Sequence, residues 1–194
     1  MLIQGKQNGV SLIELMIGIA IVSLLMVMGA PSFGLWMQNT QTRTAAESIQ
    51  NGLQIARSEA VRRNANVRFN LTDATGAVAW TVDCVNVTAD CPVGIQTRSG
   101  GEGGSNARAG ISVDAATPVI GTAIAAGTGL PAGVTFDGIG RVPTANVGTD
   151  IARVDVTNAT NAEVRRMVII IGSGGQTRMC DPAIALATNP QGCS

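Results

Sequence analysis

The chain has 194 residues with 13 basic and 13 acidic side chains, which leaves room for one ordinary domain and an appendage. Its zero formal net charge argues against attraction of the whole surface to nucleic acid. The sequence contains no histidine, which excludes the commonest general base, the commonest neutral metal ligand and any Ser-His or Cys-His catalysis. We therefore expect a structural or interaction protein rather than an enzyme, with no catalytic residue, cofactor or metal site.

The N-terminal region contains a long apolar segment. Residues 10–30 carry one charged side chain, that of Glu14. A helix of this length spans about 32 Å at about 1.5 Å per residue, close to the membrane hydrocarbon core of about 30 Å. A cleaved secretory signal peptide would have a shorter apolar core. A plain membrane anchor would not explain a carboxylate that costs about 2.5–3.5 kcal/mol to insert.

A third interpretation explains both the length and the glutamate. The segment GVSLIELM, residues 9–16, closely resembles the leader junction of type IV pilins and type II secretion pseudopilins. The resemblance implies a leader, residues 1–9, which a prepilin peptidase removes after Gly9, and N-methylation of the new first residue, Val10. It also implies that Glu14 meets the N-terminal ammonium of a neighbouring subunit during assembly. The family usually has Phe and Thr where this chain has Val10 and Ser11, a mild departure.

The helix is expected to continue past the membrane. Pro31 removes one backbone donor and predicts a kink, and pilins commonly have a proline at this distance from the cut. Beyond it, apolar side chains recur at helical spacing: Ala45, Ile49, Leu53, Ala56 and Ala60. We expect a transmembrane half, residues 10–36, and an amphipathic half, residues 37–64, that packs on a sheet. Gly52 weakens its middle by up to about 1 kcal/mol.

A second motif lies on the amphipathic half. Residues 55–63, IARSEAVRR, resemble the A-R-S-E-A-V segment of the GspH/FimT branch, which contains minor pseudopilins and minor pilins. This resemblance is more specific than the leader junction, which every pilin shares.

The pattern changes after residue 64 to short extended runs separated by turn residues. Residues 67–71 and 77–82 flank the turn sequence DATG, which predicts a hairpin. Further strands are expected at residues 111–113, 119–124, 134–136, 151–156, 165–171 and 176–180. The expected fold class is α+β, with the long N-terminal helix packed on an antiparallel β-sheet domain, residues 65–194. The glycine-rich loop 99–106 lacks the GKS/T ending and the βαβ setting of a nucleotide-binding loop.

All four cysteines follow the apolar segment and are therefore expected in the oxidising periplasm: Cys84, Cys91, Cys180 and Cys193. Four cysteines allow three pairings, and proximity in sequence favours Cys84–Cys91 and Cys180–Cys193. The second pair would close a C-terminal loop and contribute about 3 kcal/mol. A zinc site is the alternative, but the sequence offers neither a C-x₂-C spacing nor a histidine.

The C-terminal region raises the question of DNA binding. It resembles the closing hairpin of FimT/FimU-type minor pilins, whose DNA-uptake members carry a G-R-x-R motif that contacts phosphates. The matching stretch here, residues 175–178, reads GQTR, so the second arginine, Arg178, is present and the first is replaced by Gln176. Arg165 and Arg166 could supplement it, although neighbouring strand residues face opposite sides. A solvated arginine on a turn is the alternative interpretation.

Together these features predict a minor pilin of a type IV pilus, a filament-priming or tip subunit held in the inner membrane by one helix with its C-terminal domain in the periplasm. Its expected partners are other pilin or minor pilin subunits, the prepilin peptidase and an inner-membrane assembly platform. A type II secretion minor pseudopilin is the first alternative, and a DNA receptor for uptake is the second. Neighbouring genes would separate the pilus from the secretion system.

Overall fold

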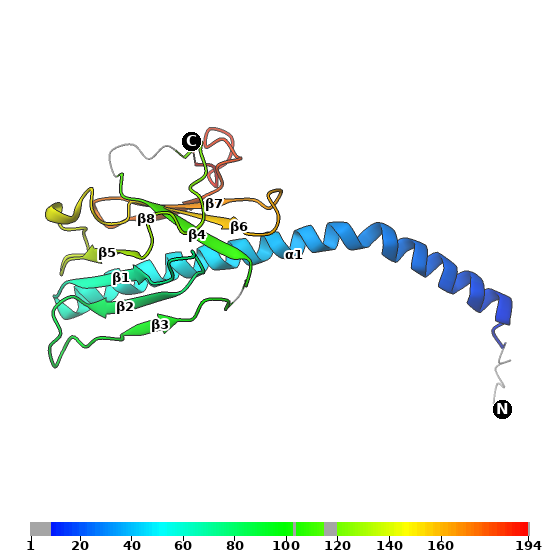
Figure 1. Ribbon diagram of the computed structural model, residues 1–194, viewed down its shortest axis with the longest axis horizontal. Coiled ribbons are helices and arrows are strands. Elements are labelled where there is room, and N and C mark those ends of the chain that lie inside the picture. The colour runs from blue at the N-terminus through cyan, green and yellow to red at the C-terminus, as the bar shows by residue number, and fades with distance from the viewer. Residues whose placement is uncertain (1–8, 103, 115–119, 194) are drawn as a thin grey trace, which may run out of the picture. The chain divides into compact units, whose positions relative to one another are not determined.

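The computed structural model of the chain describes residues 9–102, 104–114 and 120–193, and for residues 28–31 it describes the backbone only. The chain divides into two compact units, Met1–Met37 and Gln38–Ser194. One helix, α1 (Leu12–Arg63), contributes to both units (Figure 1). The predicted leader, residues 1–9, lies outside the described residues except for Gly9.

The helix ends where its backbone turns left-handed at Asn64, with φ of 48°. The amide of Ala65 donates to the carbonyl oxygen of Ala60 at 3.1 Å, and the amide of Asn64 donates to the carbonyl oxygen of Val61 at 3.3 Å. This pair of bonds is a Schellman motif, and asparagine tolerates the left-handed conformation better than most residues. The cap turns the chain sharply from the helix into the first strand.

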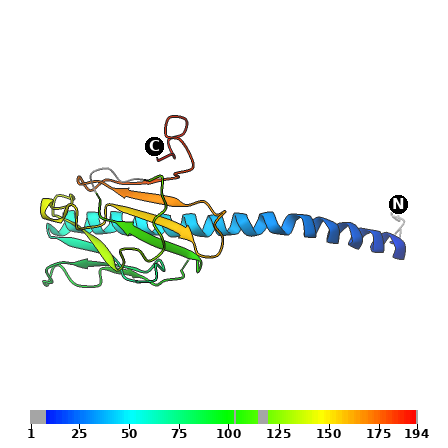
Figure 2. The same cartoon turned by 45° about the horizontal axis from the view of Figure 1, so that its top comes forward.

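The second unit contains two antiparallel four-stranded sheets (Figure 2). The first has the order β3-β2-β1-β5, and its strands are β1 (Val67–Leu71), β2 (Trp80–Cys84), β3 (Gln96–Arg98) and β5 (Ala132–Phe136). The second has the order β4-β6-β7-β8, and its strands are β4 (Ala107–Ser112), β6 (Arg153–Asn158), β7 (Met167–Ile171) and β8 (Thr177–Cys180). A short 3₁₀ helix, η1 (Thr144–Asn146), precedes β6.

The amphipathic half of α1 and both sheets share one hydrophobic core. The predicted helical stripe is fully buried, with Ala45, Ile49, Leu53, Ala56 and Ala60 at most 1% exposed. These side chains pack with alternating buried residues of β1, such as Phe69, and with central residues of β6. The expected α+β class is therefore confirmed, with two sheets on the helix instead of one.

Gly52 has a packing role, although glycine has a low helix propensity. A Cβ atom at this position would lie 2.7 Å from Cε2 of Phe69 and 3.2 Å from Cδ2 of Trp80. The two rings contact each other with centroids 5.7 Å apart. Glycine therefore lets the helix approach the aromatic pair on the first sheet.

The strand predictions were partly wrong. The hairpin around DATG is confirmed, because β1 pairs antiparallel with β2. Residues 120–124, the described part of the expected strand 119–124, form no strand, because their polar backbone atoms bond to side chains of the second sheet, as described below. β3 was missed, since three mostly exposed polar residues give no alternating apolar signal.

Candidate functional site

The expected processing junction lies immediately before α1. Gly9 and Val10 are exposed and non-helical, and the first helical residue is Leu12. The Gly9–Val10 peptide bond is therefore exposed and lies outside the helix. Glu14 lies in the first turn of the helix, where a carboxylate is favoured by the positive end of the helix dipole.

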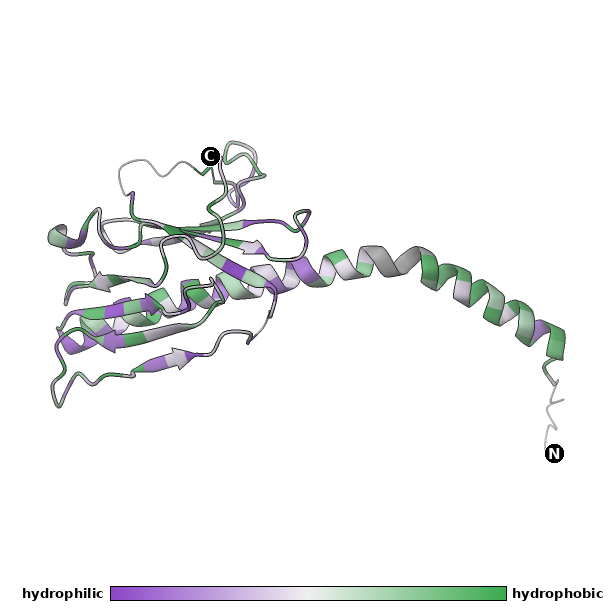
Figure 3. Ribbon diagram, in the orientation of Figure 1, coloured by the Kyte–Doolittle hydropathy of each residue, from purple (hydrophilic) through white to green (hydrophobic). Residues whose placement is uncertain are grey.

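Apart from Glu14 and Ser23, residues 12–27 are apolar or glycine, and Figure 3 shows hydrophobic colouring along most of this part of the helix. These residues are exposed around the whole circumference, including large side chains such as Leu12 at 79% and Met26 at 69%. A helix that is apolar all round needs a membrane or other helices to cover it. In the described part of the chain, no unbroken helix passes a length and hydropathy test for a membrane span, but the bent pair Leu12–Val27 and Ser32–Arg63 passes it.

The motif A-R-S-E-A-V joins the helix to the loops at its end. Ala56 and Ala60 are buried in the core. Arg57 donates from Nε to the carbonyl oxygen of Gly140 at 2.9 Å. Gly140 in turn packs on Gly175, where an added Cβ would lie 1.9 Å from the Gly140 oxygen. The glycine of the GQTR stretch is therefore required for close backbone packing next to Arg57.

The glutamate of the same motif holds two arginines. Glu59 Oε2 accepts bonds from Arg62 Nη2 at 2.6 Å and Arg63 Nε at 2.7 Å. The bond from Arg62, reinforced by Arg63, holds the pKa of the Glu59 carboxyl below its usual range despite the opposing effect of burial. Arg63 also donates from Nη1 to the carbonyl oxygen of Asp90. The motif thus fixes the loop after β2 to the last turn of α1.

The four cysteines form two disulfides between sequence neighbours, Cys84–Cys91 and Cys180–Cys193. Their Cα atoms are 5.6 Å and 5.0 Å apart, within the ordinary range for a disulfide. The first closes the loop after β2, and the second ties the C-terminal segment to the end of β8. All four sulfur-bearing residues are buried.

Arg178, the arginine of the GQTR stretch, contacts the C-terminal disulfide loop. Its Nη2 atom donates to the carbonyl oxygens of Pro190, at 3.3 Å, and of Gly192. These bonds hold two backbone carbonyls of the loop that Cys180 and Cys193 close. The guanidinium therefore already has a structural role, and a phosphate would compete with these carbonyls for it.

The two other candidate arginines point in different directions, as expected for neighbours in an extended segment. Arg166 is mostly buried and pairs with Asp155 at 2.5 Å. The side chain of Arg165 is 69% exposed, and its Nη1 atom lies 3.7 Å from Oδ2 of Asp181. The backbone amide of Arg165 donates to Oδ1 of Asn39 on the helix. Among the predicted DNA-binding residues, Arg165 is therefore the most accessible cation.

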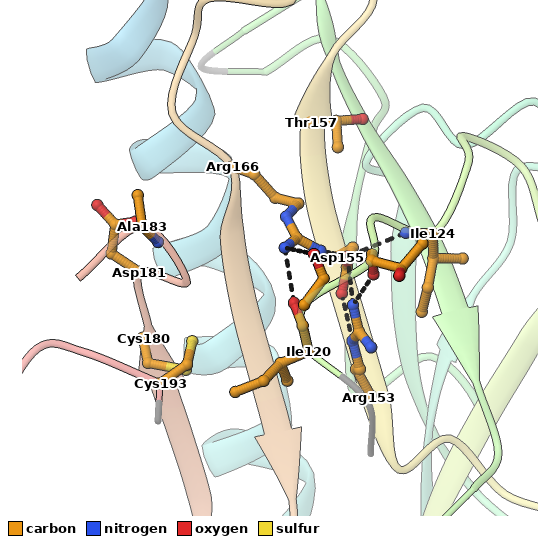
Figure 4. A network of polar contacts seen from close by, with 12 residues as sticks. Ile120, Ile124, Arg153, Asp155, Thr157, Arg166, Cys180, Asp181, Ala183 and Cys193 are labelled. Atoms are coloured by element: carbon orange, nitrogen blue, oxygen red, sulfur yellow. Dashed lines mark hydrogen bonds and ion pairs between the residues drawn. A yellow bond between two sulfur atoms is a disulfide. The ribbon is translucent and has the colours of Figure 1, made fainter. Parts of the chain in front are cut away.

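Asp155 is the centre of a buried polar network on β6 (Figure 4). The carboxylate is 0% exposed and accepts bonds from Arg153 at 2.6 Å and from Arg166 at 2.5 Å. It also accepts a hydrogen bond from the backbone amide of Ile124 at 3.0 Å, while Arg153 donates to the carbonyl oxygen of Thr122 at 2.7 Å. The network fastens residues 120–124 across the second sheet. The sequence suggests DNA binding for Arg166 and a strand at residues 119–124 but no role for Asp155, because the segments that meet here lie far apart along the chain.

Nothing in the described geometry resembles a metal centre, since no group of three or more His, Cys, Asp or Glu residues there is placed to hold an ion. The described residues form an apolar helix that follows an exposed, non-helical Gly9–Val10 segment, and a two-sheet domain that packs on the continuation of that helix. This combination defines a pilin-like subunit.

The comparisons with known proteins agree. The chain belongs to the GspH family, because residues 45–175 match the family described as Type II transport protein GspH. Residues 4–30 match the prokaryotic N-terminal methylation motif. No curated protein matches the sequence.

Two solved structures match this chain. One crystal structure of the type IV minor pilin FimU from Pseudomonas aeruginosa has a TM-score of 0.52 and 15% identity, covering 82% of this chain and 99% of that one. A second crystal form of the same protein gives a TM-score of 0.47 and 17% identity, covering 78% and 99%. At this identity the first match shows a shared pilin fold.

Proposed function

We propose that this protein is a minor pilin of a type IV pilus, anchored in the inner membrane with residues 38–194 in the periplasm. Prepilin peptidase would remove residues 1–9, and residues 10–36 would span the membrane before assembly. The observation that carries the proposal is the junction: an exposed Gly9–Val10 bond directly before an apolar helix with Glu14 in its first turn. The pilin fold of the domain supports it.

Glu14 would act in assembly through its charge. After cleavage, Val10 would carry a new N-terminal ammonium, which would then be N-methylated. A carboxylate inside a membrane is costly unless a cation lies next to it. Pairing with the ammonium of a neighbouring subunit would remove that cost and fix the register between the two helices. A kink at Pro31 would let the apolar half adjust inside the filament.

The test separates processing from assembly. Mass spectrometry of the full chain recovered from membranes should show a new N-terminus at Val10 bearing a methyl group. Glu14→Ala should leave this cut intact and lower recovery in sheared filaments. Glu47→Ala is the matched control, because it removes an exposed helical carboxylate that pairs locally with Arg43. An uncut chain, or normal recovery of the Glu14 variant, would contradict the proposal.

A type II secretion minor pseudopilin is the second candidate, and the description of the matched family favours it. The mechanics of anchoring and assembly would be the same. Deleting the gene would then impair type II protein secretion and leave pili intact. The pilus role predicts the opposite pattern.

DNA binding is a separate property that the arginines suggest. A gel shift at low salt with residues 38–194, which form one compact unit, should test it. Salt-sensitive binding that Arg165→Ala weakens would support the DNA role, because this guanidinium is largely exposed. Arg178→Ala is the second variant, and its folding must be checked because the side chain holds the C-terminal loop.

A further inference from the structure

The aromatic residues of the chain divide into a buried and an exposed group. The sequence contains three phenylalanines, two tryptophans and no tyrosine. Three of these residues belong to the core of the domain, where Phe69, Trp80 and Phe136 are at most 3% exposed. The other two, Phe33 and Trp36, lie on α1 and are 58% and 62% exposed. Large exposed rings that lie together mark a surface that a partner or a membrane covers.

Phe33 and Trp36 form one aromatic patch. They are three positions apart, which places them on the same face of the helix. Their ring centroids are 5.7 Å apart, and the ring planes are inclined by 36°. Met37, the next residue along the chain, is exposed as well. The two rings therefore act as a single unit on the helix surface.

The aromatic patch lies where the character of α1 changes. On its N-terminal side the chain has no charged residue after Glu14, and residues 15–27 are exposed around the whole helix. On its C-terminal side, residues 38–43 read QNTQTR, and Arg43 carries the first charge. The patch thus separates an uncharged, mainly apolar segment from a polar one.

The distance from Glu14 to Trp36 fits the thickness of a lipid bilayer. Twenty-two positions separate the two residues along one helix. This corresponds to about 33 Å along the axis, against about 30 Å for the hydrocarbon core, and a tilt of the helix reduces the difference. Moving the helix by one turn in one direction would bring Glu14 into hydrocarbon, and moving it in the other would bring Gln38 and Asn39 there. One depth therefore satisfies both ends of the segment.

We propose that Phe33 and Trp36 bind the glycerol and headgroup layer on the periplasmic face of the membrane and hold the free subunit at this depth. This inference rests on the proposed function, which places residues 10–36 in the bilayer. Indole combines a large apolar ring with one N–H donor, so it favours the layer between hydrocarbon and water. Phe33 lies about 4.5 Å deeper, beside the acyl chains. Glu14 then stays at the cytoplasmic face, and the cost of burying its carboxylate arises only on assembly.

A partner helix is the alternative occupant of the patch. One packed helix would cover one side of α1, whereas the side chains of residues 12–27 are exposed on every side. A bilayer covers all sides at once. Lipid is therefore the occupant that the whole segment favours for the free subunit.

The test measures the depth of Trp36 in phosphatidylcholine vesicles that hold the full chain at high dilution. Trp80 is buried in the domain, so subtracting the emission of a Trp36→Phe variant isolates Trp36. Bromine on the acyl chains quenches tryptophan at short range and can be attached near the glycerol or near the methyl end. Glycerol-end bromine should quench Trp36 at least about twofold more than methyl-end bromine.

Two tryptophans placed in the Trp36→Phe background calibrate the measurement. Leu25→Trp lies eleven positions from both Glu14 and Trp36 and should be quenched most by methyl-end bromine. Thr44→Trp replaces an exposed residue beyond the first charge and should respond to acrylamide in the water but to neither lipid.

Anchoring has a readout of its own. Replacing Phe33 and Trp36 by leucine in the Leu25→Trp chain removes the preference for the headgroup layer but keeps the segment apolar. The ratio of methyl-end to glycerol-end quenching should then fall by about twofold, because movement off the midplane in either direction lowers it. An unchanged ratio would show that the two rings do not set the depth, and would overturn the inference.

Three results for Trp36 would also overturn the inference: strongest quenching by methyl-end bromine, quenching by acrylamide alone, or quenching by none of the reagents, which would show that protein covers the ring. If Leu25→Trp is still quenched by methyl-end bromine, the helix spans the bilayer and the proposed function stands. If Leu25→Trp responds to acrylamide and to neither lipid, the helix is outside the bilayer, and the inference and the proposed membrane anchor both fail.

Discussion

Replacing Gly52 by alanine sets helix propensity against packing. In an exposed helix the change stabilises by about 1 kcal/mol, because glycine loses the most backbone entropy on folding. Here the new methyl group would lie 2.7 Å from Phe69 Cε2 and 3.2 Å from Trp80 Cδ2. The Phe69 ring is fully buried and cannot swing away.

Overpacking of this kind costs about 1–3 kcal/mol. Subtracting the gain in propensity leaves a net destabilisation of about 0–2 kcal/mol for Gly52→Ala. Gly52→Leu adds more volume with a similar propensity and should cost more. Asn51→Ala is the control, because Asn51 is the preceding, exposed residue of the same helix, and it should be neutral or slightly stabilising.

Urea unfolding followed by tryptophan fluorescence measures these effects. A Trp36→Phe background leaves Trp80, next to Gly52, as the single tryptophan of the chain. The expected order of unfolding midpoints is Asn51→Ala, then Gly52→Ala, then Gly52→Leu, from highest to lowest. If Gly52→Ala instead raised the midpoint as much as Asn51→Ala does, the close approach of helix and sheet would be refuted.

Four further substitutions test the buried polar network, the Glu59 ion pairs and the C-terminal disulfide loop. Asp155→Leu leaves two mostly buried arginines without their carboxylate and should cost about 3–5 kcal/mol in urea unfolding, whereas a loss below about 1 kcal/mol would contradict the network. Glu59→Gln should destabilise the domain at neutral pH. Because folding lowers the pKa of Glu59, the stability difference between wild type and variant should disappear as the pH falls through the folded pKa, below 4.5. A difference that persists at lower pH would argue against an ionic cause. Cys193→Ser should expose the loop after Cys180 to proteolysis and lower the free energy of unfolding by about 3 kcal/mol. Arg178→Ala should increase proteolytic cleavage of the same loop with the disulfide intact. Unchanged digestion of both variants would show that neither the disulfide nor Arg178 holds the loop.

The helix and its buried stripe could be predicted from the sequence because they rest on periodicity, which is local. Ala45, Ile49 and Leu53 recur at helical spacing and are buried as expected. The division into two sheets could not be predicted, because pairing between distant strands such as β1 with β5 leaves no local pattern. The strand predicted at residues 119–124 was wrong for the same reason. Asp155, whose carboxylate accepts a bond from the amide of Ile124, lies thirty-one positions further along the chain.

The motif at residues 55–63 shows what a resemblance leaves unexplained. As a sequence pattern, the motif indicates a family but does not explain why each residue type occurs at its position. In the structure, Ala56 and Ala60 are small because the helix packs on the core there. Arg57 reaches the Gly140 carbonyl, and Glu59 positions Arg63 on the loop after β2.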